Sequence, residues 1–394
     1  MSRVARVAWA RNLSVMRKAA LYIHIPFCVA KCNYCSFNSY AGLEHLHEVY
    51  LDALEEEISL SAQQWGPLEA PSVYIGGGTP TILGAELLGR VVRACKDHFL
   101  MHADAEITVE ANPGTVDAMN LSTLRKLGVN RVSLGVQSFN DGMLVMLGRV
   151  HHAREAEEAY CLVRQAGFDN VNLDLIYGLP KQDLAQWETD LSKTISLRPE
   201  HLSLYCLSLE EETPLARSIC SGDVPAPDPD LAAEMYETAE AKLAGAGYVH
   251  YEISNWAVRG RECRHNLVYW HNEPYLGFGA GAHSFDGAFR YHNLLSPQEY
   301  VQRIASGAEA VAAREEIDRA TEMSETMILG LRLLEGVSFQ QFEERFQISA
   351  PLLYGMAMEQ LVALGLLNLS DGVARLTRRG RLLANEVFER FLPG

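Results

Sequence analysis

The sequence lacks the features of several protein classes. No run approaches about eighteen uninterrupted apolar residues, so a membrane-spanning helix is not expected. Positively charged residues are fewer than negatively charged ones: the chain has 34 Lys and Arg, 50 Asp and Glu, and a net charge of −16. This balance argues against nonspecific nucleic-acid binding. There is no low-complexity tract. The remaining composition, 48% hydrophobic and 21% charged over 394 residues, is that of a soluble chain with two or three domains.

Cysteine is present, but its distribution is uneven. Eight cysteines occur in a large chain without a secretory signal, which favours a reducing, cytoplasmic compartment over a disulfide framework. Five are scattered, and we expect them to be buried thiols: Cys95, Cys161, Cys206, Cys220 and Cys263.

The other three, Cys28, Cys32 and Cys35, form a CxxxCxxC motif just after the strand-like run 21–25. Thiolates bind iron–sulfur clusters, and a [4Fe–4S] cube ligated by three of them keeps one iron open for a small molecule. A zinc site is the alternative. It would need a fourth Cys or His, and His24 and His45 are poorly spaced for that role.

The order of apolar runs predicts an α/β fold. Amphipathic stretches separate β-rich runs, as in βα units around a parallel sheet. We expect strands at 21–25, 73–75, 106–110, 131–136, 171–176 and 201–207. We expect helices between them at 48–64, 85–98, 122–127, 153–166 and 184–197. These units fall short of the eight of a full barrel, which leaves a partial barrel or a doubly wound sheet.

Polar or glycine-rich residues follow nearly every predicted strand. Gly76-Gly77-Gly78-Thr79-Pro80 follows the second strand, Glu110 ends the third, and Gln137 follows the fourth. Asp174 lies in the fifth. Ligands bind at the carboxyl ends of parallel strands, so this chemistry should converge on the rim that carries the cysteine loop.

The chain divides into five predicted segments. Residues 1–20 are basic and without acid, and we expect a tail or an upstream translation start there rather than an organellar transit peptide. Residues 21–222 form the barrel, the Pro-rich 223–230 a connector, and 231–320 a smaller α+β region rich in aromatics and glycine. Residues 321–394 read as helices at 324–334, 338–346 and 350–364, a hairpin over 366–377 and a last helix, which is a winged-helix-like order. Their basic set is too small to predict DNA binding.

The cysteine motif, placed on this pattern, resembles that of radical S-adenosylmethionine (SAM) proteins. The GGGTP at 76–80, GVQSFN at 135–140 and DLIYGLP at 174–180 resemble the coproporphyrinogen-oxidase branch of that family. The resemblance covers residue 21 to the C-terminus and implies an open (β/α)6 TIM-like barrel, a [4Fe–4S] cluster on Cys28, Cys32 and Cys35, and SAM on its open iron. It further implies that the SAM pocket is formed by Tyr22, Tyr34, Gly77, Gly78, Thr79, Glu110, Gln137, Arg149 and Asp174.

Two departures separate this chain from the oxidases of the branch. The oxidases carry a fourth cysteine two positions after the third, where this chain has Phe37, and a longer segment before the cluster motif. Both departures favour the sister group of haem chaperones. The segment 265–270 resembles the HNxxYW motif of that group, which implies haem as a further ligand of His265, Asn266, Tyr269 and Trp270.

The chemistry of that segment is compatible with haem. An imidazole is a natural axial ligand, and Tyr and Trp offer flat apolar faces to a porphyrin. Packing of the middle region onto the barrel is the alternative role of these aromatics. Cys263 and His271 compete with His265 for the iron.

Two functions therefore follow from the resemblance. The first is a haem chaperone that delivers haem to acceptor haemoproteins, membrane-bound respiratory enzymes among them. The second is oxygen-independent coproporphyrinogen III oxidation by radical SAM chemistry, for which the intact SAM rim argues. The motif, Phe37 and the short N-terminus favour the chaperone, without oxidase activity. A homodimer is compatible with either function, and nucleic acid is not an expected partner.

Overall fold

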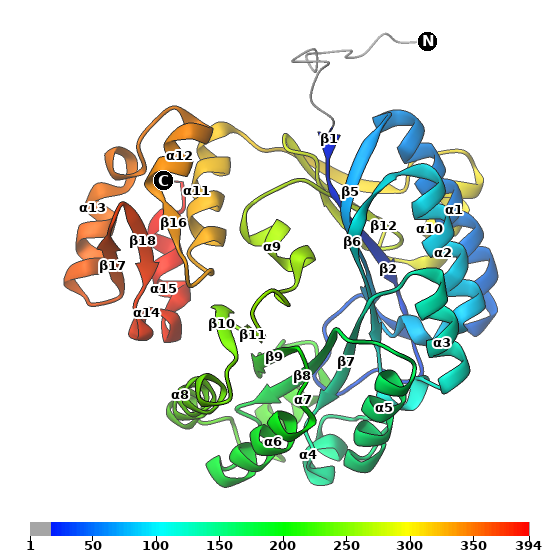
Figure 1. Cartoon of the computed structure of the whole chain (residues 1–394), viewed down its shortest axis with the longest axis horizontal. Helices are drawn as coiled ribbons and strands as arrows, with labels where there is room; N and C mark the ends of the chain where they lie inside the picture. Colours follow the sequence, from blue (N-terminus) through cyan, green and yellow to red (C-terminus); the bar gives the residue numbers. More distant parts are fainter. Residues whose placement is uncertain (1–16, 394) are drawn as a thin grey trace.

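A computed structural model describes residues 17–393 of the chain. A 13-stranded sheet dominates it, in the order β10-β11-β9-β8-β7-β6-β5-β2-β12-β13-β14-β15, with β1 (Arg17–Lys18) paired to β5. Figure 1 shows this sheet curving around an open interior, with the C-terminal elements on the open side. Most of the predicted basic segment 1–20 lies outside the described residues.

The six predicted barrel strands are all present and parallel to one another. They are β2 (Ala20–Ile25), β5 (Leu68–Gly77), β6 (Leu100–Ala111), β7 (Arg131–Gln137), β8 (Val171–Tyr177) and β9 (His201–Cys206). The cysteine loop adds a small ladder of β3 (Phe27–Cys28) and β4 (Tyr40–Ala41). The partial barrel of the radical SAM type, predicted from the resemblance, is confirmed.

Helices cover the outer face of the barrel because alternate strand residues are apolar. Val73 and Ile75 of β5, like Ile107 and Val109 of β6, pack into one core with the helices. The predicted helices are confirmed as α1 (His47–Trp65), α2 (Gly84–His98), α3 (Ala118–Leu127), α5 (Ala153–Gln165) and α6 (Leu184–Leu197). Two short helices at the rim were not predicted, α4 (Asp141–Met146) and α7 (Pro214–Cys220).

The inner face of the same strands is polar. Asp174 of β8 accepts hydrogen bonds from Ser133 of β7, at 3.1 Å, and from Asn172, at 2.8 Å. His201 of β9 contacts the Asn172 amide oxygen at 2.6 Å. A full barrel usually fills its interior with branched apolar side chains. A lumen of hydrogen-bonded polar groups is instead suited to holding a ligand.

The middle region extends this sheet at both edges. β10 (Val249–Glu252) and β11 (Asn255–Ala257) add antiparallel strands beside β9, after α8 (Pro229–Gly245). β12 (Tyr275–Phe278) pairs in parallel with β2 at the opposite edge. The outer strands and helix of this region are β13 (His283–Phe285), β14 (Phe289–Asn293), β15 (Val311–Glu316) and α10 (Pro297–Ala305). The connector at 223–230 thus leads back into the same sheet, and the division into domains stays a prediction.

One short helix, α9 (Arg264–Trp270), connects the two edges of the sheet. It follows β11 on the β9 side and precedes β12 on the β2 side. In Figure 1 it lies between the barrel and the C-terminal elements. The predicted HNxxYW segment is therefore placed across the open side of the barrel.

The C-terminal region has its own apolar core, in which Met327, Phe342, Leu361 and Phe391 are almost fully buried. Its elements are α11 (Arg319–Gly330), β16 (Val337–Ser338), α12 (Phe339–Phe346), α13 (Ala350–Ala363), β17 (Leu367–Ser370), β18 (Val373–Leu376), α14 (Arg378–Leu382) and α15 (Ala384–Phe388). This is the winged-helix-like order predicted.

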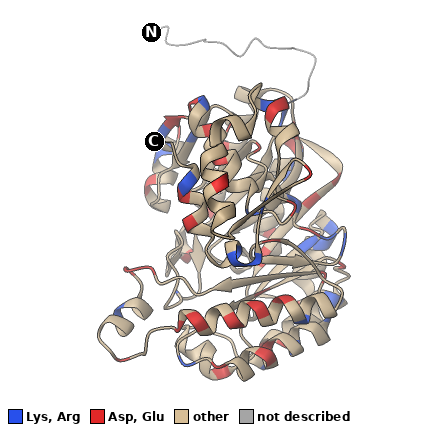
Figure 2. Cartoon of the chain, turned by 90° about the vertical axis from the view of Figure 1, so that its left-hand side faces the viewer, with Lys and Arg blue, Asp and Glu red and all other residues tan. Residues whose placement is uncertain are grey.

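The bounds of α11 differ from the predicted 324–334. Asp318 caps the helix through the Thr321 N–H, so it begins earlier. It also ends earlier, because residues 332–334 leave the helix to hydrogen-bond with 251–253 of β10. Two basic residues of this region, Arg378 and Arg381, bind Glu240 of α8. Figure 2 shows Lys and Arg interspersed with Asp and Glu along the ribbon on this side.

The scattered cysteines only partly follow the prediction. Cys95 and Cys263 are buried, but Cys161, Cys206 and Cys220 are exposed, because they lie on the outer sides or ends of their elements. Within residues 17–393, no helix is both long and apolar enough to cross a bilayer.

Candidate functional site

The three motif cysteines lie together on one loop at the rim of the barrel. Cys28 ends β3, and Cys32 and Cys35 follow before β4. All three are half-buried free thiols. Each sulfur has a polar neighbour: Thr79 Oγ1 lies 3.7 Å from Cys28 Sγ, an Arg149 N–H donates to Cys32 Sγ at 3.4 Å, and Ser39 Oγ lies 3.9 Å from Cys35 Sγ.

This donor set fits a [4Fe–4S] cluster. Burial raises the pKa of the Cys28 thiol, while the hydroxyls of Thr79 and Ser39 lower it. Hydrogen bonds to the sulfurs stabilise bound thiolates. Residues 17–393 contain no group of three or more Cys, His, Asp or Glu arranged for a single ion. A cube spreads its ligands more widely than one ion does, so a loop of three separate thiols is compatible with it.

The glycine loop after β5 is bound directly to the cysteine loop. Gly78 N–H donates to Ile25 O at 2.8 Å, and Thr79 N–H donates to Phe27 O at 2.7 Å. A Cβ built at Gly78 would lie 2.5 Å from Phe27 O and 3.0 Å from Cys28 Sγ. Gly77 has a φ of +117° and leaves no room for a Cβ beside His24. Glycine at 78 is therefore required by the packing of the cysteine loop, and glycine at 77 by its positive φ and by His24 of β2.

If the rim holds SAM, as the resemblance implies, replacing Gly78 by alanine should reduce SAM affinity by about tenfold or more, which is about 1.4 kcal/mol. The added methyl group must displace the backbone beside Cys28. The measurement is SAM perturbation of the cluster's EPR signal across a SAM titration. Gly114→Ala is the matched control, since a Cβ at Gly114 meets nothing within 4 Å. Equal SAM affinity in the Gly78→Ala protein and the wild type would contradict the assignment.

Two carboxylates face the lumen next to this loop. Glu110 accepts hydrogen bonds from Tyr74 Oη at 2.9 Å and from the Gly77 N–H at 3.0 Å. Burial, followed by repulsion from Asp174, raises the pKa of Glu110 to about 7. Burial also raises the pKa of Asp174, whose oxygens are held by Ser133 and Asn172. Fixed carboxylates in a polar lumen are suited to an ammonium or hydroxyl ligand.

Arg149 forms hydrogen bonds with both the strand ends and the cysteine loop. Its guanidinium donates to Asn112 Oδ1 at 2.5 Å, to Gly135 O at 2.8 Å and to Cys32 Sγ. Gln137 lies beside it at the end of β7, buried and with a φ of +68°. Asn112 was not among the predicted site residues.

The remaining rim residues are also brought to this side of the barrel. Tyr34, in the cysteine loop, packs against a small apolar cluster that includes Met143 and Leu179. Tyr22 contacts His24 Nδ1 through its hydroxyl at 3.0 Å, and His24 Nε2 contacts Asn38 O at 2.8 Å. Burial raises the pKa of both tyrosines.

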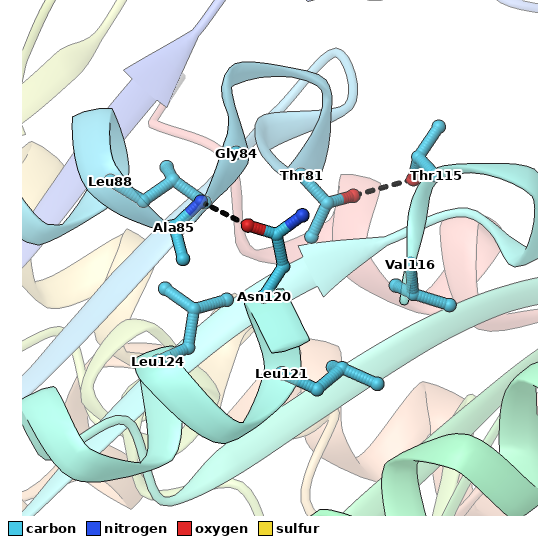
Figure 3. Close-up of a pocket in the computed structure, with 9 residues that line it drawn as sticks. All are labelled: Thr81, Gly84, Ala85, Leu88, Thr115, Val116, Asn120, Leu121 and Leu124. Atoms are coloured by element: carbon cyan, nitrogen blue, oxygen red, sulfur yellow. Dashed lines mark hydrogen bonds between the residues drawn. The ribbon is translucent and has the colours of Figure 1, made fainter. Parts of the chain in front are cut away.

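Hydrogen bonds behind the rim join the loops after β5 and β6 (Figure 3). Thr81 and Thr115 are 2.6 Å apart through their hydroxyls, and the Ala85 N–H donates to Asn120 Oδ1 at 3.0 Å. They border a hollow of about 10 Å³, too small for anything but a water molecule. The hydrogen bonds around the hollow support the rim, and the hollow itself is not a ligand site.

Helix α9 is fixed to the barrel by Glu106 of β6. The buried carboxylate accepts from the Arg264 N–H at 3.3 Å, from the His265 N–H at 3.2 Å and from Cys263 Sγ at 3.5 Å. It thereby satisfies backbone donors that a helix N-terminus leaves without partners. Cys263 is fully buried, and burial raises the pKa of its thiol to about 12.

His265 points into the lumen and is 1% exposed. Its Nδ1 lies 3.0 Å from Ser72 Oγ, and its Nε2 lies 2.9 Å from Tyr269 Oη. Burial, with a smaller effect of Arg131, lowers the pKa of His265 to about 3, so the ring is neutral. Asn266, also named in the predicted haem motif, makes no side-chain hydrogen bond to this ring within the described structure; Ser72 and Tyr269 do so instead.

The end of α9 faces away from the lumen. Trp270 lies under the Arg332 guanidinium, 4.3 Å from the ring centre, and its Nε1 is buried without a partner among the described residues. Trp270 and the exposed His271 border a cleft of about 350 Å³ between α9 and the C-terminal region. Phe342 and Arg345 line its other side. The motif thus presents His265 to the lumen and Trp270 to the cleft.

Comparison with known proteins identifies the family. Residues 22–193 match the Radical SAM superfamily, and residues 317–383 match the HemN C-terminal domain. A heme chaperone HemW of Bacillus subtilis (strain 168) is 39% identical over 372 residues, covering 94% of this chain and 98% of that protein. The chain belongs to the HemW family of radical SAM proteins.

Two other relatives are similar over most of their length. The heme chaperone HemW of Escherichia coli (strain K12) is 34% identical, with 95% of this chain and 98% of that protein covered. Radical S-adenosyl methionine domain-containing protein 1, mitochondrial, of Mus musculus is 33% identical, with 96% and 88% covered.

The solved structure of coproporphyrinogen III oxidase (HemN) from Escherichia coli matches with a TM-score of 0.84 at 26% identity. The match covers 95% of this chain and 90% of that one. The resemblance drawn from the motifs is confirmed at the level of family and fold.

Proposed function

We propose that this HemW-family chain is a haem chaperone, which holds a [4Fe–4S] cluster, SAM and haem and delivers haem to acceptor haemoproteins. The observation that carries the proposal is helix α9, whose imidazole and aromatic side chains cross the open side of the barrel beside the rim. HemW relatives named heme chaperones, similar over nearly the whole chain, support it.

Each ligand has candidate residues in this arrangement. Cys28, Cys32 and Cys35 would hold the cluster, which would supply an open iron for SAM. Glu110, Asp174, Gln137 and Arg149, with the backbone of 77–79, would hold SAM. When bound, SAM would supply either a structural ligand of the cluster or the source of a radical.

For haem, His265 is the proposed axial ligand, and Tyr269 and Trp270 the apolar faces. In the present conformation both ring nitrogens of His265 are hydrogen-bonded. Ligation therefore requires α9 to release one of them. The cleft beside Trp270 lies in the size range of small-molecule sites, but His265 faces the lumen. Haem ligated by His265 would therefore reach the cleft only after α9 turns.

Coproporphyrinogen III oxidation remains the second candidate because of the structural match to HemN and the complete rim. A carrier needs no residues that position SAM for cleavage. The acceptors, among which we count membrane-bound respiratory enzymes, the homodimer and the cytoplasmic location stay predictions.

The test combines both functions in one sample. Anaerobically reconstituted protein is titrated with haem and assayed with coproporphyrinogen III and SAM. We expect about one haem per chain, with a shifted Soret band, and little or no decarboxylation. Robust conversion to protoporphyrinogen without haem binding would favour the oxidase instead.

A further inference from the structure

Tyr74 of β5 connects the two halves of the proposed site. Its hydroxyl donates to Glu110 Oε1 at 2.9 Å, and the second Glu110 oxygen accepts the Gly77 N–H. The phenol therefore fixes the orientation of a carboxylate at the SAM rim. Tyr74 was not among the predicted site residues, because it lies within the strand and before the glycines at 76–78.

The ring of Tyr74 faces helix α9. Its centre lies 5.2 Å from that of the His265 imidazole, at an interplanar angle of 32°. Ser72, two residues earlier on β5, contacts His265 Nδ1. Strand β5 thus holds the imidazole by a hydrogen bond and a ring contact, and the same tyrosine holds Glu110.

Tyr22 completes this group. Its ring is stacked on Tyr74 with the centres 6.3 Å apart, and lies 6.4 Å from His265. Through His24, Tyr22 is connected to Asn38 O in the loop that carries the cysteines. The rim, the cysteine loop and α9 therefore share one continuous set of packed aromatic rings and hydrogen bonds.

We propose that Tyr74 is a positioning residue that couples SAM binding to haem binding. The inference rests on the proposed function and adds that SAM and haem oppose each other's binding. The packed arrangement holds Glu110 ready for SAM. Ligation of haem iron by His265 would break one of its two hydrogen bonds and move the imidazole relative to the Tyr74 ring that packs against it. SAM and haem should therefore weaken each other's binding, by the same factor in both directions.

The experiment measures this factor in the full-length reconstituted protein. Haem affinity is determined from Soret titrations with and without saturating SAM, and SAM affinity by equilibrium dialysis with and without haem. Wild-type protein should show a reciprocal loss of affinity of about fivefold or more. Tyr74→Phe keeps the ring against His265 and removes the hydroxyl bound to Glu110. It should bring the factor close to one, while haem affinity without SAM stays near the wild-type value.

Tyr248→Phe is the matched control. Its phenol is also buried, donating to Pro199 O at 2.7 Å, and makes no hydrogen bond to the rim or to α9. It should retain the wild-type factor. A factor of one in the wild type, or an undiminished factor in Tyr74→Phe, would overturn the coupling and leave the proposed function intact. Failure to bind haem or SAM at all would overturn the proposed function and the inference with it.

Discussion

Replacing any one of Cys28, Cys32 and Cys35 by alanine should abolish the iron–sulfur cluster. The three thiols are free and gathered on one rim loop, and no other cysteine of the described structure shares it. A cube already lacking a fourth protein ligand has no substitute for a lost thiolate. Anaerobic reconstitution should give about four irons per chain in the wild type and almost none in the variants. The measurement is iron and sulfide content together with the thiolate-to-iron absorption.

Two other cysteines provide the controls. Cys95→Ala removes a buried thiol of α2, and Cys161→Ala removes an exposed thiol of α5. Both proteins should reconstitute like the wild type. Retention of the full iron content after loss of Cys28, Cys32 or Cys35 would mean that the ligands are misassigned.

The second large effect is expected at α9. His265→Ala should weaken haem binding by about tenfold or more and change the Soret band, because it removes a strong-field nitrogen donor. Before ligation, one hydrogen bond of the buried ring must break, which costs about 1–3 kcal/mol and must be offset by the iron–nitrogen bond. The measurement is a haem titration with absorption spectra of both oxidation states.

His271→Ala, six residues further along the chain, is the matched comparison. His271 is exposed at the cleft, whereas His265 is buried in the lumen. The His271→Ala protein should bind haem with the wild-type spectrum. If only His271→Ala changes the spectrum, the protein still binds haem, but the axial ligand lies at the cleft. If neither substitution changes the spectrum, Cys263 is the next candidate.

The strands were predictable where alternation was uninterrupted. The runs over β7, β8 and β9 set the bounds of those strands to within a residue. The first half of β5 was not predictable because Pro71 interrupts it. The structure accommodates this proline at a register shift between Ala70 and Ser72. Proline at such an irregularity gives up no ladder hydrogen bond, and local pattern cannot reveal it.

The site was predictable where chemistry depends on spacing along the chain. The cysteines and glycines are adjacent in sequence, and their loops are adjacent in space. Tyr74 and Glu106 were not predictable, because their partners lie on other strands and in α9. Which residues meet across the lumen depends on the register of each strand pair, and a single sequence does not specify it. The crossing of α9 from one sheet edge to the other likewise follows from topology alone.

That topology also determines when each strand can pair during synthesis of the chain. β2 is among the first strands synthesised, yet one of its two edges pairs only with β12, which the ribosome delivers after the whole barrel. Until then β2 exposes unpaired backbone groups at one edge, as β9 does until β11 is made, and such edges promote aggregation. A fragment ending after β9 should therefore precipitate rather than fold as a small SAM-binding unit. Helix α9 emerges just before β12, so it is made before the exposed edge of β2 is paired.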